Sequence, residues 1–212
     1  MEFYESFMKF SFADSDVFCI EADPLVVNST GLKACECVVL LSPRVAFIEA
    51  KASAPKEVAS SAFMDEIKRK FADSLRLFNE IKNKQHGDEA FNRLPIRLRE
   101  LSIDPQSYLI CLIVHGHQLD WLVGLQDAFR DAMREVVTEW NIQDSNVRVY
   151  NEETALESKL IVAYIPKEER DSVRETDAKS NMSGEKVKAD SYTHLKLPTS
   201  LGVYRRGGLL YT

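Results

Sequence analysis

The feature that most constrains this chain is a run of ten residues, SYLICLIVHG at 107–116, in which almost every side chain is apolar. A strand of this kind has no polar face to turn toward water, so other elements must cover both of its faces. That requirement predicts a central strand in a layered structure. Residues 61–83 and 119–140 repeat apolar side chains at helical spacing, and helices at these positions can supply a covering layer.

The remaining segments complete an expected order of elements. Residues 1–12 carry phenylalanines at helical spacing and predict a first helix. Strands are expected at 17–23, 33–41, 44–51, 147–150 and 160–165, and a long polar excursion with a short helix is expected at 84–106. Ser42 and Pro43 separate two of these strands as the turn of a hairpin. The predicted fold class is therefore α/β, with a mixed α+β sheet flanked by helices.

The chain divides near residue 166. Residues 1–166 are sufficient for a single domain with its own core. From residue 167 the apolar periodicity stops, and such a segment cannot bury enough surface to order itself. Near the end, DSYTHLKLPT at 190–199 resembles the translated read-through of a sequencing adapter. We therefore expect one domain at 1–166 and a disordered or artefactual tail at 167–212.

The strand at 44–51, RVAFIEAK, ends with a carboxylate and an ammonium two positions apart. Residues two apart on a strand share a face, so Glu49 and Lys51 project side by side. If the hairpin is centred on Ser42–Pro43, opposed residue numbers sum to 85 and Glu36 faces Glu49. A shift of the centre by one residue puts Glu36 opposite Lys51, on the same face.

Two opposed carboxylates at the end of a buried hairpin repel one another. A cation between them relieves the repulsion, and a few oxygen ligands with room for water describe a Mg²⁺ or Mn²⁺ site. Lys51 beside the metal could orient a water or stabilise charge on a phosphate. In the alternative interpretation this is the solvated end of a strand, with Glu36 paired to Lys33 or Lys51.

This pattern resembles the PD-(D/E)XK nuclease-like superfamily, whose core runs helix, three strands, helix, strand. The resemblance covers roughly residues 1–116 and implies a restriction-endonuclease-like αβββαβ core. It implies catalytic roles for Glu36, Glu49 and Lys51, and a Mg²⁺ or Mn²⁺ ion held by Glu36, Glu49 and the Ala50 carbonyl. The first acidic residue of the superfamily is usually aspartate, and here it is Glu36.

Other residues are candidates for supporting roles. The superfamily often adds a glutamate from its first helix, for which Glu5 and Glu2 are candidates. His115 and His117 end the apolar strand and could support the site or cap the strand. Three consecutive basic residues on the long helix could contact phosphates or form a solvated helix face, namely Lys68, Arg69 and Lys70.

Charge and hydropathy limit the partners. The net charge of -6 counts against nucleic acid, but residues 64–100 hold nine Lys/Arg against seven Asp/Glu. Apolar stretches are strand-length, so no membrane span is expected. The start, MEFYESFMKF, carries acids where a secretory signal carries basic residues, and a cytoplasmic location is expected.

Three functional hypotheses follow from these features. The first is a Mg²⁺-dependent nuclease that hydrolyses phosphodiester bonds of DNA, which the intact Glu-x-Lys motif favours. The second is a catalytically inactive, nuclease-fold interaction module that binds protein or nucleic acid, which the negative charge and Glu36 favour. The third is a small regulatory protein unrelated to the superfamily.

Overall fold

The computed structural model describes residues 1–55, 61–102 and 104–166 of the chain. At its centre is a five-stranded sheet in the order β3-β4-β5-β6-β7. Its strands are β3 (Val17–Phe18), β4 (Cys37–Leu41), β5 (Arg44–Lys51), β6 (Tyr108–Val114) and β7 (Val147–Tyr150). The pairs β3–β4 and β4–β5 are antiparallel, and the pairs β5–β6 and β6–β7 are parallel. The predicted mixed α/β class is therefore confirmed.

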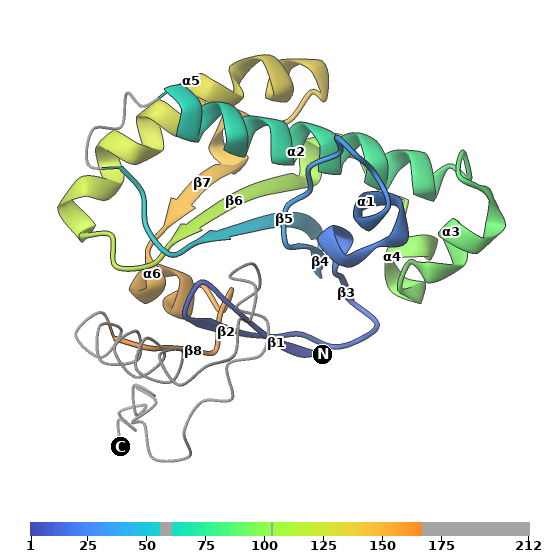
Figure 1. Ribbon diagram of the computed structural model, residues 1–212, viewed down its shortest axis with the longest axis horizontal. Helices are drawn as coiled ribbons and strands as arrows, with labels where there is room; N and C mark the ends of the chain where they lie inside the picture. The colour runs from blue at the N-terminus through green and yellow to red at the C-terminus, as the bar shows by residue number, and fades with distance from the viewer. Residues whose placement is uncertain (56–60, 103, 167–212) are drawn as a thin grey trace, which may run out of the picture.

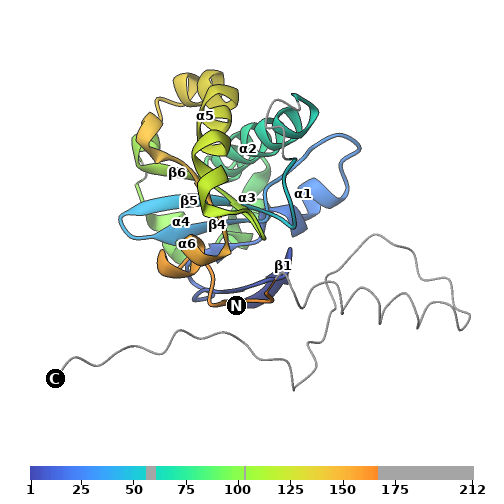
Figure 2. The ribbon, with the colours of Figure 1, turned by 90° about the vertical axis from the view of Figure 1, so that its left-hand side faces the viewer.

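Two long helices cover one face of this sheet (Figure 1 and Figure 2). They are α2 (Ser61–Lys82) and α5 (Leu122–Glu139). α2 lies in the crossover from β5 to the parallel strand β6, a connection that cannot be a tight hairpin. The apolar stripes of both helices pack on the sheet, as in the contact between Phe47 of β5 and Phe78 of α2, with ring centroids 5.6 Å apart. None of the helices in the described ranges is long and apolar enough to cross a membrane.

The other face of the sheet is covered by a second, smaller layer. It contains a three-stranded sheet in the order β1-β2-β8 and the helix α6 (Glu152–Glu157), as Figure 1 shows. The strands are β1 (Glu2–Glu5), β2 (Met8–Ser11) and β8 (Ala163–Tyr164). β6 is thus buried along its whole length between two layers, as its apolar sequence requires.

The predicted first helix is wrong, because residues 1–12 form the hairpin β1–β2. Ser6 and Phe7 make the turn with positive φ angles of 49° and 64°. The hairpin register pairs Phe3 with Phe10, and their rings stack with centroids 4.9 Å apart. A spacing of seven residues suits one face of a helix, but it also suits a cross-strand pair. The expected αβββαβ core therefore lacks its first helix, while the order of three strands, helix and strand is present from β3 to β6.

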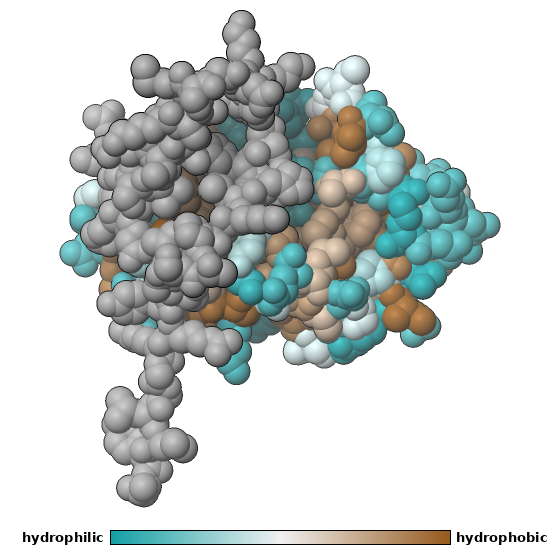
Figure 3. Space-filling model, turned by 60° about the horizontal axis from the view of Figure 1, so that its bottom comes forward, coloured by the Kyte–Doolittle hydropathy of each residue, from teal (hydrophilic) through white to brown (hydrophobic). Residues whose placement is uncertain are grey.

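Several boundaries differ from expectation. The strand expected at 17–23 ends at Phe18, and the 3-10 helix η1 (Ile20–Ala22) and the short helix α1 (Pro24–Val27) follow. The excursion at 84–106 holds two short helices, α3 (Gly87–Arg93) and α4 (Ile96–Glu100), and Figure 3 shows hydrophilic side chains over that end of the molecule. Three further 3-10 helices are η2 (Pro105–Ser107), η3 (Leu119–Trp121) and η4 (Asp144–Asn146). The tail predicted at 167–212 lies outside the described residues.

The hairpin β4–β5 has the predicted register. Cys37 pairs with Ile48, and Leu41 pairs with Arg44, so opposed numbers sum to 85. Along β5, Val45 and Phe47 pack toward α2 and α5, whereas the alternate residues face the smaller layer. Glu49 continues the first series and therefore points toward the helices.

Candidate functional site

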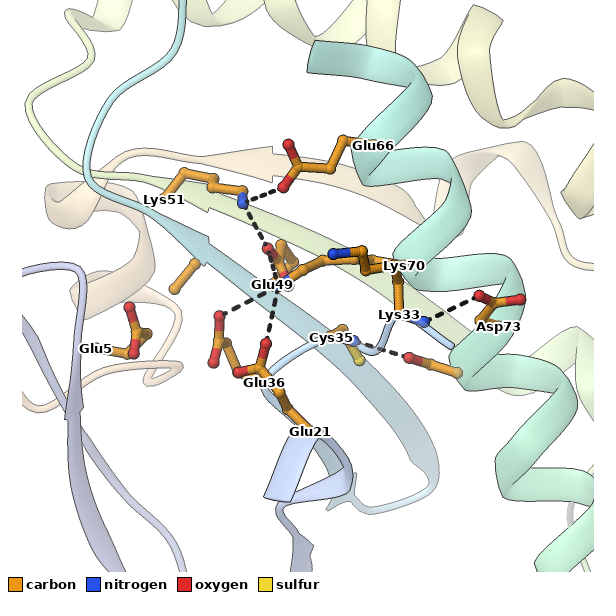
Figure 4. Close-up of polar contacts among 12 residues, drawn as sticks. Glu5, Glu21, Lys33, Cys35, Glu36, Glu49, Lys51, Glu66, Lys70 and Asp73 are labelled. Carbon is orange, nitrogen blue, oxygen red and sulfur yellow. Dashed lines mark hydrogen bonds and ion pairs between the residues drawn. The ribbon is translucent and has the colours of Figure 1, made fainter. Parts of the chain in front are cut away.

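Glu49 is held between two lysines on the helix side of β5. Its side chain is 0% exposed, and its Oε1 lies 3.2 Å from the Nζ of Lys51 and 2.9 Å from the Nζ of Lys70. Lys70 also donates to Oε2 of Glu49 at 3.1 Å. Figure 4 shows both ammonium groups directed at this carboxylate, one from β5 itself and one from α2.

Two further carboxylates meet Lys70 from the side of η1 and β4. Glu36 lies immediately before β4, and its Oε1 is 3.9 Å from Lys70 Nζ. Glu21 is in η1, and its Oε1 is 3.2 Å from the same nitrogen. The sequence predicted that Glu36 and Glu49 would face each other and hold Mg²⁺ or Mn²⁺. In the structure these carboxylates lie 3.9 and 2.9 Å from the ammonium of Lys70, which the sequence did not place there.

Helix α2 also fixes the chain segment that leads into Glu36. The guanidinium of Arg69 donates to the Gly31 carbonyl, Asp73 accepts from the Lys33 N–H at 3.1 Å, and Ser74 accepts from the Cys35 N–H at 2.8 Å. Ser74 is fully buried, so its hydroxyl supplies the partner that a buried backbone N–H needs. One helix therefore both carries Lys70 and positions Glu36.

A fourth carboxylate, Glu66, completes the group by accepting from Lys51 at 2.9 Å. Glu66 and Lys70 are four residues apart on α2, so they share a helix face. We call the six residues the Glu49 cluster: Glu21, Glu36, Glu49, Lys51, Glu66 and Lys70. It contains four carboxyl groups and two ammonium groups, so acid is in excess.

The pKa values of the carboxyl groups in the cluster reflect their burial and the charges around them. Burial, then the charge of Glu49 and the contact with Glu21, raises the pKa of Glu36 to about 10. Burial also raises the pKa of Glu49, although Lys70 and Lys51 oppose it. For Glu21, burial is outweighed by hydrogen bonding with Glu36 and by Lys70, which leave its pKa below the ordinary value. The surroundings of Glu36 therefore favour its protonated, uncharged form.

The two lysines remain charged. Burial lowers the pKa of Lys51, but Glu49 and Glu66 offset this and leave it above the ordinary value. The pKa of Lys70 is likewise raised, because Glu49, Glu36 and Glu21 outweigh its desolvation. Both ammonium groups can therefore act as fixed positive charges beside Glu49.

The residues available for a metal fit a hard divalent cation with few protein ligands. Among the described residues, no group of three or more His, Cys, Asp or Glu side chains is arranged to hold a metal ion. Mg²⁺ commonly needs only one or two carboxylates and keeps several waters. Glu36 and Glu49 supply that number.

The backbone and hairpin candidates lie near the same end of β5. The Ala50 carbonyl accepts a hydrogen bond from the Ser6 hydroxyl at 3.2 Å. Glu5 accepts from the N–H and the hydroxyl of Ser6 at 3.0 and 3.1 Å, and its charge contributes to the raised pKa of Glu36. Glu5 thus approaches the cluster from a hairpin turn, whereas the resemblance implied a helix.

The two histidines have other surroundings. His115 follows β6 on the side of the smaller layer, where its Nε2 lies 2.6 Å from the Ile165 carbonyl and its ring contacts Phe7 and Tyr164. His117 packs its ring on Trp121, with centroids 5.6 Å apart. These contacts place both rings in the packing around the end of β6.

The three consecutive basic residues of α2 point to three different partners. Lys68 pairs with the exposed carboxylate of Glu135 on α5, and Arg69 holds the Gly31 carbonyl. Lys70 is 8% exposed and lies inside the Glu49 cluster, so the interpretation as a solvated helix face is wrong for this residue. Sequence reasoning did not identify Lys70, Glu21 and Glu66 as neighbours of Glu49.

Comparison with protein-family models, with curated proteins and with solved structures finds no significant match to this chain.

Proposed function

We propose that this chain is a metal-dependent nuclease that hydrolyses phosphodiester bonds of DNA. The observation that carries the proposal is the meeting of Glu36, Glu49 and Lys51 at the end of β5, within a run of three strands, helix and strand. Glu49 and Lys51 share a strand face, and Glu36, immediately before β4, lies 3.9 Å from the same Lys70 ammonium that pairs with Glu49. The sequence resemblance assigns catalytic roles to these same three residues.

Each residue has a role that its position permits. Glu36, Glu49 and the Ala50 carbonyl would hold Mg²⁺ or Mn²⁺, which when bound polarises a phosphodiester and lowers the pKa of water. The ammonium of Lys51 is partly exposed and paired on one side with Glu49. It can donate a hydrogen bond to a phosphate oxygen or to an attacking water, and its positive charge favours the negative charge that develops there.

A cleavage assay tests this proposal. Purified protein is incubated with single-stranded and duplex DNA in Mg²⁺, in Mn²⁺ and in a chelator. We expect metal-dependent cleavage, and we expect Lys51→Ala and Glu49→Gln each to lower its rate by about 100-fold or more. Lys84→Ala, which removes an ammonium paired with Asp88 outside the cluster, is the matched control and should cleave normally. Absence of cleavage by the wild type, or full cleavage by Lys51→Ala, would contradict the proposal.

A second candidate function, a catalytically inactive interaction module, is favoured by one contact. Lys70 already supplies a positive charge to Glu21, Glu36 and Glu49, and a buried ion network of this kind can be structural. Under this alternative the protein retains DNA or a protein partner without cutting DNA. An electrophoretic mobility-shift assay separates the two. DNA binding that Glu49→Gln leaves unchanged, together with no cleavage in Mg²⁺ or Mn²⁺, would favour the interaction module over the enzyme.

A further inference from the structure

The ammonium of Lys70 lies where the carboxylates of the Glu49 cluster converge. It contacts both oxygens of Glu49, at 2.9 and 3.1 Å, and it is 3.9 Å from Glu36 Oε1. Its side chain is 11% exposed, so bulk water screens its charge only weakly. In Figure 4 the side chain enters from α2 and ends beside Glu49, between β5 and the helix.

A divalent metal bound by Glu36 and Glu49 would need the same oxygens. Mg²⁺ binds carboxylate oxygens at about 2.0–2.1 Å, closer than any ammonium contact. Lys70 engages both oxygens of Glu49, so a metal ligated by that carboxylate brings a second cation against the first. Like charges at such separations repel strongly when partly shielded from water. The two cations therefore compete for one position.

We propose that the Lys70 ammonium is an internal cation that competes with the divalent metal for Glu36 and Glu49, and that metal binding displaces it. The inference rests on the proposed function, because it concerns the metal of that same site. Lys70 then acts as a built-in counter-ion that keeps the metal-free site intact and weakens metal binding.

The structure also shows a carboxylate with which the displaced ammonium can stay paired. Glu21 Oε1 is 3.2 Å from Lys70 Nζ, and the Glu21 side chain is 47% exposed. A lysine stem is long and flexible, so its head can shift toward water while the stem stays buried. Lys70 can thus leave Glu49 and remain paired with Glu21, so displacement does not strand a buried charge.

Metal affinity in Lys70 variants tests the competition directly. Free Mn²⁺ is titrated against wild type, Lys70→Met, Lys70→Gln and Lys70→Arg, with bound ion measured by electron paramagnetic resonance. We expect the two neutral variants to bind Mn²⁺ at least tenfold more tightly than wild type, and Lys70→Arg to show no gain. Lys68→Met removes a charge from the same helix outside the cluster and should bind as wild type does. Unchanged or weaker binding in both neutral variants overturns the inference.

A measurement on the wild type covers the case in which the variants do not fold. Lysine acetylation rates are followed by mass spectrometry with and without saturating Mg²⁺, and Lys70 should react at least threefold faster with the metal. Equal rates at a demonstrated metal occupancy overturn the displacement.

The outcomes for the two proposals are separable. If wild type neither cleaves DNA nor binds Mn²⁺ but a neutral Lys70 variant binds it, the nuclease proposal fails and the competition stands. If no folded form binds Mn²⁺, the competition fails as well.

Discussion

Two acidic residues only two positions apart, Glu21 and Asp23, lead into two very different ion networks. Asp23 is 1% exposed and receives two hydrogen bonds from the guanidinium of Arg93, at 2.8 and 3.0 Å. It also accepts from the N–H of Leu25 at 2.9 Å and so caps α1. One carboxylate and one guanidinium satisfy each other there. Glu21 instead joins the Glu49 cluster, in which four carboxyls share two ammonium groups.

We call the Asp23–Arg93 pair closed, because one carboxylate meets one guanidinium. We call the Glu49 cluster open, because its carboxyl groups outnumber its ammonium groups. A bidentate arginine–carboxylate pair is complete in itself and stabilises a fixed geometry. The Glu49 cluster has two more carboxyl groups than ammonium groups, and burial together with its acidic neighbours raises the pKa of Glu36 to about 10. Carboxyl groups that outnumber their counter-ions can bind a metal ion or a positively charged group of a substrate in place of a proton. Three predictions test this comparison.

The largest effect is expected from breaking the closed pair. Asp23→Ala removes the cap of α1 and leaves the guanidinium of Arg93 without its bidentate partner. We expect the free energy of unfolding to fall by about 3 kcal/mol, since a partly buried charge loses its counter-ion. Urea denaturation measures the loss, and addition of Mn²⁺ should not restore it.

The control for this change is Asp131→Ala, which breaks an exposed pair with Arg134 and should cost less than about 1 kcal/mol. If Asp23→Ala costs no more than the control, the Asp23–Arg93 pair is not the stabilising contact inferred here.

A smaller effect of opposite sign is expected in the open cluster. The folded-state pKa of Glu36 is about 10 against an ordinary value of 4.5, so between these values the folded state binds more protons than the unfolded chain. The contribution of Glu36 to stability therefore decreases as pH rises through that window. Glu36→Gln mimics the protonated form and should raise metal-free stability at pH 8 by on the order of 2 kcal/mol.

Thermal melts between pH 5 and pH 9 check this prediction, and the gain should shrink toward pH 5. Glu135→Gln, at an exposed carboxyl whose pKa is lowered by its hydrogen bond with Lys68, provides the control and should show no such gain. A lower melting temperature for Glu36→Gln at pH 8 would show that Glu36 is ionised and needed by Lys70.

The smallest effect is expected at the rim of the cluster. Glu66 is half exposed and accepts from Lys51 at 2.9 Å. An exposed ion pair contributes little, so Glu66→Gln should cost less than about 1 kcal/mol, and high salt should reduce the difference further. A loss as large as that of Asp23→Ala would mean that Glu66 belongs to the buried framework and not to the rim.

The hairpin register was predicted from its turn, because Ser42 and Pro43 mark the point where the chain reverses. Polarity did not help, because both faces are buried: Val45 and Phe47 pack toward the long helices, and Ile48 packs toward the smaller layer. That register fixes the positions of Glu49 and Lys51 at the end of β5. The N-terminal phenylalanines did not distinguish a helix from a hairpin, because their spacing fits a helix face and a cross-strand pair equally well.

The contact of Lys70 with Glu49 was not predicted, because three basic residues in a row suggest phosphate contacts or a solvated helix surface. Its position carried a weak signal, since Ile67 and Ser74 lie one turn away on either side and are fully buried. A lysine at the margin of an apolar stripe is expected to reach back toward the core or out to water, and helical periodicity does not decide which. The decision comes from Glu49, which is distant in sequence and becomes a neighbour only when α2 packs on β5.

The three-stranded sheet joins the first described strands to the last. β2 meets β8 through Met8–Tyr164 and Lys9–Ala163, across a loop of about 150 residues whose closure costs chain entropy. Such a short, non-local pairing is expected to open before the central sheet does, as a separate cooperative unit. Amide protons of residues 2–11 should then exchange with solvent sooner than those of β5. Opening would uncover the Ala50 carbonyl, which accepts from the Ser6 hydroxyl, while the Glu49 side chain stays covered by α2.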